Sequence, residues 1–153
     1  MTETDATDRR ILALLQKDGR MTNAELASRI NLSASACHRR VQRLEEAGVI
    51  TGYVALLDQR KVSRPTTVFV EITLTGQADD LLDAFERAVR AIPDVLECHL
   101  MAGTADYLLK IVVEDTDDFA RFHRQHLSRL PGVRQMHSSF ALRTVFRSTA
   151  IPV

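Results

Sequence analysis

A short pattern that occurs twice in the second half of the chain restricts the fold more than any other feature of the sequence. Residues 92–99 (Ile-Pro-Asp-Val-Leu-Glu-Cys-His) align with residues 130–137 (Leu-Pro-Gly-Val-Arg-Gln-Met-His), 38 positions later. Each copy follows an amphipathic helical stripe and precedes an apolar stretch, so each predicts a junction from a helix to a strand. Two matching junctions indicate that this region is built from two similar halves.

The residues around these junctions predict alternating strands and helices. Val68, Val70, Ile72 and Leu74 alternate with residues of the opposite face, as in a half-buried strand. The expected elements are a strand from 68, a helical stripe over 78–92, a strand over 95–102, a turn at 103–105, a strand over 107–113, a helix from Thr116 with Phe119, Phe122, Leu127 and Leu130 inward, and a strand over 133–146. This βαββαβ order predicts an α+β, ferredoxin-like domain.

A small sheet with helices on one face leaves its other face uncovered. We expect Val95, Met101 and Leu108 on that open face, beside polar residues. A partner subunit is the natural cover for such a surface.

The first half of the chain reads as three short helices. Apolar residues predict a helix over about 5–18, with Gly19 in the position of a left-handed cap. Thr22 and Glu25 form a capping box that opens the second helix, and 31–33 is a tight turn. Ser33 is the expected N-cap of the third helix. A strand is expected over 53–57, followed by a polar, basic connector over 59–65 that acts as a hinge.

The third helix has two different faces. Cys37, Val41 and Leu44 form a buried stripe, while Ser35, Arg39, Gln42 and Arg43 lie opposite, with His38 and Arg40 on the flanks. Two helices joined by a tight turn, the second with a basic outer face, are typical of a helix-turn-helix. The expected DNA contacts are Ser33, Ser35, His38, Arg39, Gln42 and Arg43. Arginines and hydroxyls suit phosphates, Arg also suits guanine, and Gln suits adenine. Arg40 is expected to pair with Glu45 or Glu46. The alternative is an ordinary solvated helix face.

Charge and composition agree with a DNA-binding first half. The 153 residues carry no net charge, but residues 1–64 hold 11 Lys or Arg against 8 Asp or Glu, and residues 65–153 hold 9 against 12. No apolar run is long enough for a membrane span, and the polar start does not resemble a signal peptide, so a soluble cytoplasmic protein is expected. Cys37 and Cys98 are expected to be free thiols. His123 and His126 lack a third ligand, so no metal site and no cofactor are predicted.

Several dispersed stretches resemble the Lrp/AsnC family, the leucine- and asparagine-responsive transcription regulators. They are residues 15–20, 33–41, 52–53, 97–100, 106–109 and 130–133. The resemblance covers about residues 8–145. It implies a winged helix-turn-helix followed by a ferredoxin-like effector domain, in dimers that often assemble further, commonly into octamers. It also implies that an amino acid or related metabolite binds between effector domains and modulates transcription from a DNA operator. Ala34 and Ala36 depart from the family, where many relatives carry proline.

The expected domains are 1–51 for DNA binding, 52–65 for strand and linker, and 66–153 for effector binding and oligomerisation. Gly103 permits close backbone approach, and Asp106 offers a carboxylate to an amino acid's ammonium group. The resemblance favours effector contacts from these residues, from their loop and from the last strand. The full expected set is Met101, Gly103, Thr104, Asp106, Tyr107, Ser138 and Ser139. The alternative is an ordinary hairpin, in which Gly and Asp are common.

Two other functions compete with gene regulation. An enzyme is disfavoured, because no nucleophile has a plausible base beside it and neighbours such as Cys37 and His38 point about 100° apart on a helix. A metabolite-binding oligomerisation module without a DNA role remains an alternative. The basic outer face of the third helix distinguishes the regulator from that module.

Overall fold

The computed structural model describes residues 4–153 and divides into two compact units. One comprises Met1–Leu56 together with Val145–Val153, and the other comprises Leu57–Thr144. The final segment of the chain, residues 145–153, therefore belongs to the first unit. The expected domain limits of 1–51, 52–65 and 66–153 stay a prediction, and residues 1–3 lie outside the described part. Over residues 4–153 no helix is long and apolar enough to cross a bilayer.

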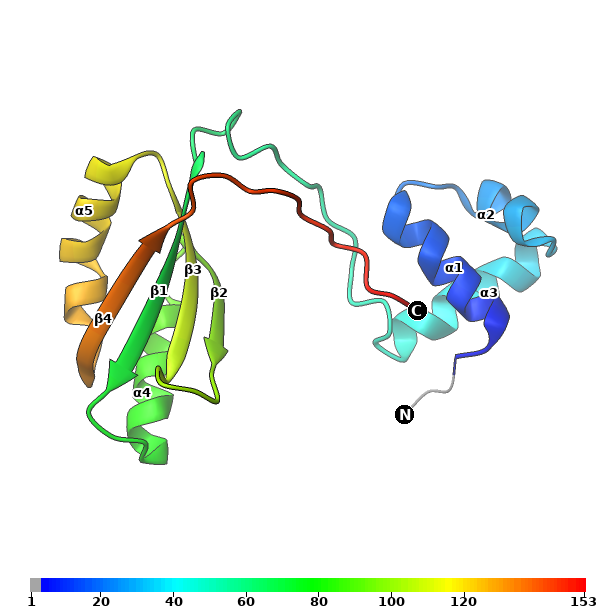
Figure 1. Ribbon diagram of the computed structural model, residues 1–153. Helices are drawn as coiled ribbons and strands as arrows, with labels where there is room; N and C mark the ends of the chain where they lie inside the picture. The colour runs from blue at the N-terminus through cyan, green and yellow to red at the C-terminus, as the bar shows by residue number, and fades with distance from the viewer. Residues whose placement is uncertain (1–3) are drawn as a thin grey trace. The chain divides into compact units, whose positions relative to one another are not determined.

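The first unit contains three helices, α1 (Ala6–Lys17), α2 (Asn23–Ile30) and α3 (Ala34–Glu46), shown in blue to cyan in Figure 1. Their apolar stripes meet in a core that includes Ile11, Leu26 and Leu44, each at most 2% exposed. The capping box at Thr22 and the Ser33 N-cap are both confirmed. These caps fix where α2 and α3 begin, and thereby the tight turn between them.

Two expectations for this unit are wrong. Gly19 is not left-handed. Helix α1 ends instead at Asp18, which has an extended backbone and whose N–H still donates to the carbonyl of Leu14. The helix ends that are left-handed are at Asn31 (φ 58°), which ends α2, and at Gly48 (φ 70°), which follows α3. The expected strand over 53–57 is not formed either. Within the described residues, no backbone hydrogen bond joins 53–57 to a neighbouring segment, so its apolar residues have no ladder to complete.

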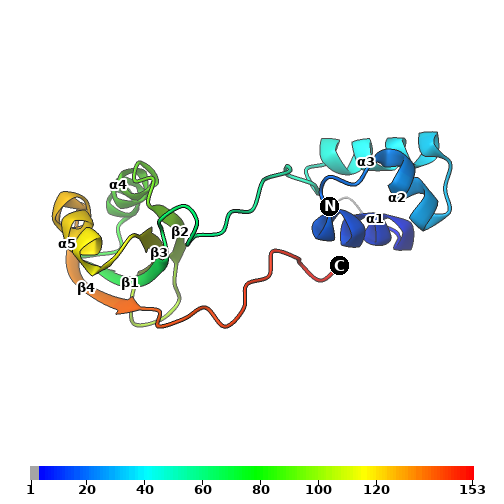
Figure 2. The same cartoon turned by 90° about the horizontal axis from the view of Figure 1, so that it is seen from above.

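The second unit is a four-stranded antiparallel sheet with two helices on one face (Figure 2). The strand order is β2-β3-β1-β4, the ferredoxin-like arrangement expected from the sequence. The elements are β1 (Thr66–Leu74), α4 (Asp79–Arg90), β2 (Val95–Leu100), β3 (Tyr107–Val113), α5 (Thr116–Gln125), the short 3-10 helix η1 (Leu127–Arg129) and β4 (Val133–Phe140).

Alternation along β1 places the core under the helices. Val68, Val70 and Ile72 are fully buried, and Val70 lies opposite Leu109 of β3 and Ser138 of β4. Phe85 of α4 packs on this layer, with its ring centroid 4.6 Å from that of Tyr107. Burial of these side chains is the main stabilising contribution, at about 1.5–3 kcal/mol for each large apolar group.

The repeated junctions have the same structural role. Ile92 and Leu130 are buried in the core, and Val95 and Val133 begin β2 and β4. The copies differ at one position for a steric reason. Gly132 has φ 68°, and a Cβ atom there would collide with the side chain of Leu81. Any other residue at the second junction would strain the backbone and displace Leu81, whereas the first junction accepts Asp94.

Two strand expectations in this unit are also wrong. The last strand ends at Phe140 rather than at residue 146. Its ladder with β1 ends at the pair Val68–Phe140, followed by one hydrogen bond from the Ala141 N–H to the Thr67 carbonyl, and residues 145–153 belong to the first unit. Val95 does not lie on the open face. It pairs with Ile111 and packs against the core, and a bulge before Glu97 changes the register of β2 after it.

The basic connector over 59–65 folds onto the second unit as an ordered turn. The backbone of residues 58–64 forms a series of turn hydrogen bonds. Arg64 pairs with Asp118 of α5 at 3.0 Å and with Asp94 at 3.6 Å. These ion pairs attach the end of the connector to the domain that follows it.

Candidate functional site

The turn between α2 and α3 is fixed by bonds at both ends. Asn31 ends α2 in the left-handed conformation, and the Ser33 hydroxyl accepts the N–H of Ala36 at 3.2 Å. The side-chain amide of Asn23 donates to the carbonyl of Ala34 at 2.8 Å, which links the first turn of α2 to the first turn of α3. This geometry holds the two helices as a helix-turn-helix.

Four of the expected DNA contacts lie exposed along α3. These are Ser35, His38, Arg39 and Gln42, whereas Cys37 on the opposite face is fully buried. Arg39 has no ion pair and no side-chain hydrogen bond within the described residues. It borders a shallow groove shared with Arg40 and Arg43, so three guanidinium groups gather on one surface. Such a surface attracts phosphate.

A buried carboxylate holds two of these arginines. Asp8 of α1 is fully buried and accepts Arg43 Nη2 at 2.6 Å and Arg40 Nη1 at 2.9 Å. Arg40 also reaches Asp5 at 2.7 Å, so the expected pairing with Glu45 or Glu46 is wrong. The reason is that α1 packs against α3, which brings Asp5 and Asp8 close to Arg40 although they lie more than thirty residues earlier in the chain. Arg43 is half-exposed but its guanidinium is already engaged.

Three more of the expected contacts, Ser33, Ser35 and Gln42, are also hydrogen-bonded within the protein. The Ser33 hydroxyl serves as the N-cap and lies 3.3 Å from the Ser35 hydroxyl. Gln42 donates to Glu46 Oε1 at 2.9 Å, one turn further along the helix. Both bonds are solvent-exposed, so the groups exchange them readily for other partners.

The expected effector residues are only partly brought together. Met101, Gly103 and Thr104 lie exposed in the β2–β3 loop, and Gly103 has open space around it. Asp106, at the end of that loop, accepts the N–H of Leu74 at 2.7 Å and the side-chain amide of Gln77 at 2.8 Å. The Leu74 bond above all, and then the Gln77 bond, lower the pKa of the Asp106 carboxyl. Asp106 thus ties the end of β1 to the hairpin.

Tyr107 and the two serines point in different directions. Tyr107 is 1% exposed and donates to Glu86 Oε1 of α4 at 2.8 Å, on the helix side of the sheet, and burial raises its pKa. Ser138 lies opposite the buried Val70, whereas Ser139 lies opposite Phe69 on the open face. Adjacent residues of a strand face opposite sides, so Ser138 and Ser139 do not share a surface.

The open face of the sheet carries both charged and apolar groups. Lys110 of β3 pairs with Glu97 of β2 at 2.6 Å, and this bond, followed by that from His99, lowers the pKa of the Glu97 carboxyl. Leu108, half-buried as expected for this face, and Phe69, 37% exposed, lie among them. Both helices lie on the other side, as Figure 2 shows.

Comparisons with known proteins show which family has this architecture. The Lrp/AsnC ligand binding domain matches residues 67–151, and a winged helix-turn-helix DNA-binding domain matches residues 4–51. The leucine-responsive regulatory protein of Escherichia coli is 41% identical over 151 residues, covering 99% of this chain and 92% of that protein. The chain belongs to the Lrp/AsnC family.

Solved structures of Lrp/AsnC proteins and similar regulators agree over nearly the full length. An AsnC family transcriptional regulator from Agrobacterium tumefaciens has a TM-score of 0.93 at 38% identity and covers 97% of both chains. A transcriptional regulator from Neisseria meningitidis, solved as a complex with L-Met, has a TM-score of 0.92 at 37% identity, covering 98% of this chain and 97% of that one. This Lrp/AsnC chain is thus a helix-turn-helix transcription regulator with a ligand-binding domain.

Three residues of this Lrp/AsnC chain matter to the sites but are not singled out by the sequence patterns. The signal for Asp8 is an acidic residue three positions after the N-cap Asp5, the spacing of a capping box. Glu86 and Arg90 lie one helical turn apart on α4, which is a weak signal of a charged pair.

His123 and His126 lie beside Phe119 and Phe122 respectively, and residues 4–153 contain no group of three potential metal ligands.

Proposed function

We propose that the protein binds a specific DNA operator through α3 and that an amino acid changes its assembly or its affinity for DNA. The observation that carries the DNA-binding half is the exposed, unpaired Arg39 beside Arg40 and Arg43 on a helix whose other face is buried, all within the described part of the chain. The proposed contacts are Ser33, Ser35, His38, Arg39, Gln42 and Arg43. Arg39 makes the most direct contact, because Arg43 must first loosen its bond to Asp8.

The effector half of the proposal rests on the ligand-binding domain and on the L-Met complex of the Neisseria regulator. We place the amino acid at the β2–β3 loop, with Met101, Gly103, Thr104 and Asp106 from one subunit. Ser139 and the open face lie where a second subunit adds contacts. The side chains of Ser138 and Tyr107 face the helices, so we propose that these two residues contribute only by placing their strands beside the amino acid.

Assembly provides the coupling between the two halves. A dimer, and an octamer built from dimers, buries the open face and presents paired α3 helices to successive major grooves. An amino acid bound between effector domains favours the arrangement in which it makes more contacts. The protein acts as a cytoplasmic regulator with no cofactor besides this effector, and we propose no enzymatic activity for a member of this family of transcription regulators.

Salt dependence of operator binding tests the role of Arg39. Arg39→Ala is expected to weaken binding by about 1–3 kcal/mol and, if the contact is to phosphate, to reduce the slope of log affinity against log salt by about one. Arg87→Ala, an exposed arginine of α4, is the matched control and leaves both quantities unchanged. Equal affinities of Arg39→Ala and the unmodified protein across several salt concentrations would exclude Arg39 as a contact.

A thermal-shift panel of the twenty amino acids tests the effector half. At least one amino acid is expected to raise the melting temperature of the full chain, and Asp106→Asn is expected to reduce that shift. Asn keeps the size of Asp106 and its carbonyl oxygen, so it disturbs the Leu74 bond less than Ala does. An undiminished shift in Asp106→Asn would remove Asp106 from the site.

A further inference from the structure

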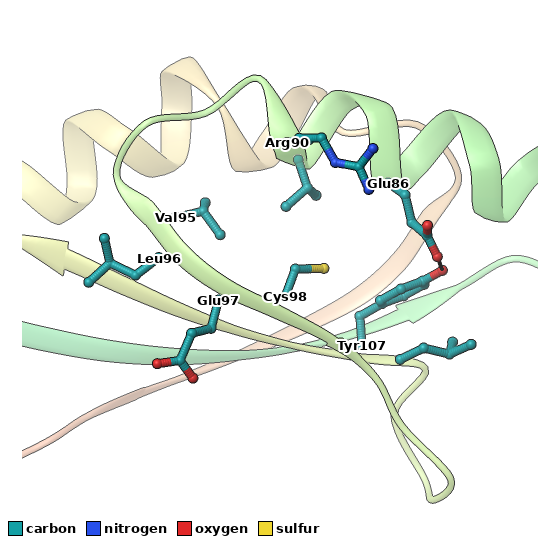
Figure 3. A pocket seen from close by; sticks show the side chains of 9 residues that line it. Glu86, Arg90, Val95, Leu96, Glu97, Cys98 and Tyr107 are labelled. Carbon is teal, nitrogen blue, oxygen red and sulfur yellow. Dashed lines mark hydrogen bonds between the residues drawn. The ribbon is translucent and has the colours of Figure 1, made fainter. Parts of the chain in front are cut away.

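A groove with no assigned role lies between α4 and β2, on the helix side of the sheet (Figure 3). It has a volume of about 320 Å³ and runs along the outer strand of the sheet. Met101, Gly103 and Thr104 of the exposed β2–β3 loop do not line it, and the buried Tyr107 is the one member of the expected effector set that does. The groove is lined by the charged residues Glu86, Arg90 and Glu97, by a thiol and by an apolar wall, and Glu97 is already paired with Lys110 at 2.6 Å.

The charged groups come from one face of α4. Glu86 and Arg90 are four positions apart, a spacing at which a glutamate and an arginine normally pair with each other. Here Glu86 Oε1 accepts the Tyr107 hydroxyl at 2.8 Å instead. Within the described residues Arg90 has neither an ion pair nor a side-chain hydrogen bond. The groove therefore offers an unpaired guanidinium and a carboxylate with one oxygen free of protein partners among those residues.

Cys98 lies within the field of both charges. Its register opposite Leu109 turns it to the helix side, and Figure 3 shows its thiol directed toward α4. Burial is the main cause that raises the pKa of this thiol, with a further rise from the Glu86 charge and an opposing effect from Arg90. Both charges are thus close enough to the floor of the groove to act on one atom there.

The remaining wall is apolar. Val89 is buried, Val95 is half-buried, and Leu100 is 62% exposed at the edge of the sheet. An exposed leucine beside a charged pair is typical of a site that accepts a small molecule with both polar and apolar parts. Glu86 suits an ammonium group, Arg90 suits a carboxylate, and the wall suits an aliphatic side chain.

We propose that this groove is a second small-molecule site that binds a zwitterion, an α-amino acid with an aliphatic side chain. Its ammonium group bonds to Glu86, its carboxylate to Arg90, and its side chain lies against Val95 and Leu100. The site is additional to the one proposed at the β2–β3 loop and does not depend on it. Because Tyr107 holds Glu86 in place, it is a positioning residue of the groove.

Reactivity of Cys98 provides a direct readout of occupancy. The sequence has two cysteines, and Cys37 is fully buried, so a disulfide reagent such as DTNB applied to the folded full-length protein reports on Cys98. Each of the twenty amino acids is added at up to about 10 mM, with L-leucine as the first probe. At about ten times its Kd, a bound amino acid is expected to slow the reaction about tenfold.

Ligand analogues and variants show which groups of the amino acid and of the groove are needed for binding. Isoamylamine lacks the carboxylate and 4-methylpentanoate lacks the ammonium group, so neither is expected to protect as L-leucine does. Arg90→Gln and Glu86→Gln are expected to abolish the protection, while the matched control Arg87→Gln keeps it. Asp106→Asn also keeps it, even though that variant is expected to lose the thermal shift of the loop site.

Four results would overturn the proposal. They are no protection by any of the twenty amino acids, full protection in Arg90→Gln, loss of protection in Asp106→Asn, and equal protection by the amine alone. Protection that rises with protein concentration without any amino acid would also overturn it, because a second copy of the chain would then cover the groove. The loop site could still bind its effector in each of these cases, so the two proposals fail separately.

Discussion

Replacement of Asp8 is expected to loosen the whole helix-turn-helix unit, although Asp8 does not face DNA. Its carboxylate is fully buried and accepts hydrogen bonds from Arg40 and Arg43 of α3. It also accepts the N–H of Asp5 at 3.2 Å, which completes the capping box of α1. Asp8→Ala removes all three bonds at once and separates the first turn of α1 from α3.

The expected loss follows from the exposure of the two arginines. Their side chains are 29% and 52% exposed, so water takes over part of each broken bond. We therefore count about 1 kcal/mol for each charge-assisted bond and about 0.5–1 kcal/mol for the cap, a total of roughly 2.5–3 kcal/mol. Asp8→Asn keeps the shape of the side chain but aims an amide donor at guanidinium donors, so it is expected to lose a similar part of the two arginine bonds.

Thiol labelling of Cys37 measures this loss of stability in the helix-turn-helix unit itself. It is fully buried in the α1–α3 core, so a thiol reagent reaches it only when the unit opens. In a Cys98→Ser background the labelling rate reflects the opening equilibrium, and roughly 2.5–3 kcal/mol corresponds to about 70- to 150-fold faster labelling. Asp18→Ala is the control, since Asp18 is exposed and its side chain bonds only within its own turn, to the N–H of Arg20.

The reasoning is refuted if Asp8→Ala labels at Cys37 no more than about threefold faster than the unmodified protein, a change below about 0.7 kcal/mol. That result would mean that the buried carboxylate costs as much in lost hydration as its arginine bonds return. A double-mutant cycle with Arg43→Ala then apportions the effect. The two substitutions are expected to be less than additive, because either one breaks the same 2.6 Å bond.

Three further predictions concern other parts of the chain. Gln16→Ala removes two hydrogen bonds to the backbone of Ile151, at 2.9 and 2.6 Å, so the Ile151 amide is expected to lose its protection from hydrogen exchange. Retained protection would show that other contacts hold residues 145–153. The pKa of Asp106 is lowered in the folded state, so the ionised carboxylate stabilises the protein above its ordinary pKa, and this contribution is lost as the pH falls through the folded pKa. Urea unfolding between about pH 2 and pH 6 should therefore show a weaker dependence of stability on pH in Asp106→Asn than in the unmodified protein. Identical pH profiles of the two proteins would contradict this. Arg64→Ala breaks the pairs with Asp118 and Asp94 and is expected to cost about 1 kcal/mol in unfolding of the second unit, whereas Arg60→Ala, also exposed in the same turn, should change it little.

The sequence predicted the elements whose signals are local. The Thr22–Glu25 capping box and the Ser33 cap lie within four residues of the groups they bond, and the alternation from Val68 to Leu74 reports burial residue by residue. The two proline junctions likewise identified both places where a helix leads into a strand. Each of these depends on contacts between near neighbours in the chain, which a pattern can record.

The errors arose where the outcome depends on residues far away in the chain. The strand expected to reach residue 146 ends at Phe140, where its ladder with β1, more than sixty residues earlier, reaches Val68, and residues 145–153 belong to the first unit. The bulge in β2 that follows Val95 is visible only in its pairing with β3. Ser138 and Ser139 could be assigned to one strand from the sequence, but only the register with Val70 and Phe69 shows that they face opposite sides.

The same distinction separates the two roles of the arginines on α3. The sequence pattern treats Arg39, Arg40 and Arg43 as similar cations, whereas the fold assigns Arg40 and Arg43 to a buried carboxylate and leaves Arg39 without a partner among the described residues. An arginine that leaves Asp8 for a DNA phosphate gives up a bond that stabilises the unit, so its net gain on binding is smaller than that of Arg39. Asp8 therefore reduces general attraction to phosphate while holding α3 in a fixed orientation against α1. In such an arrangement, discrimination between DNA sequences depends on the orientation of α3 more than on its total positive charge.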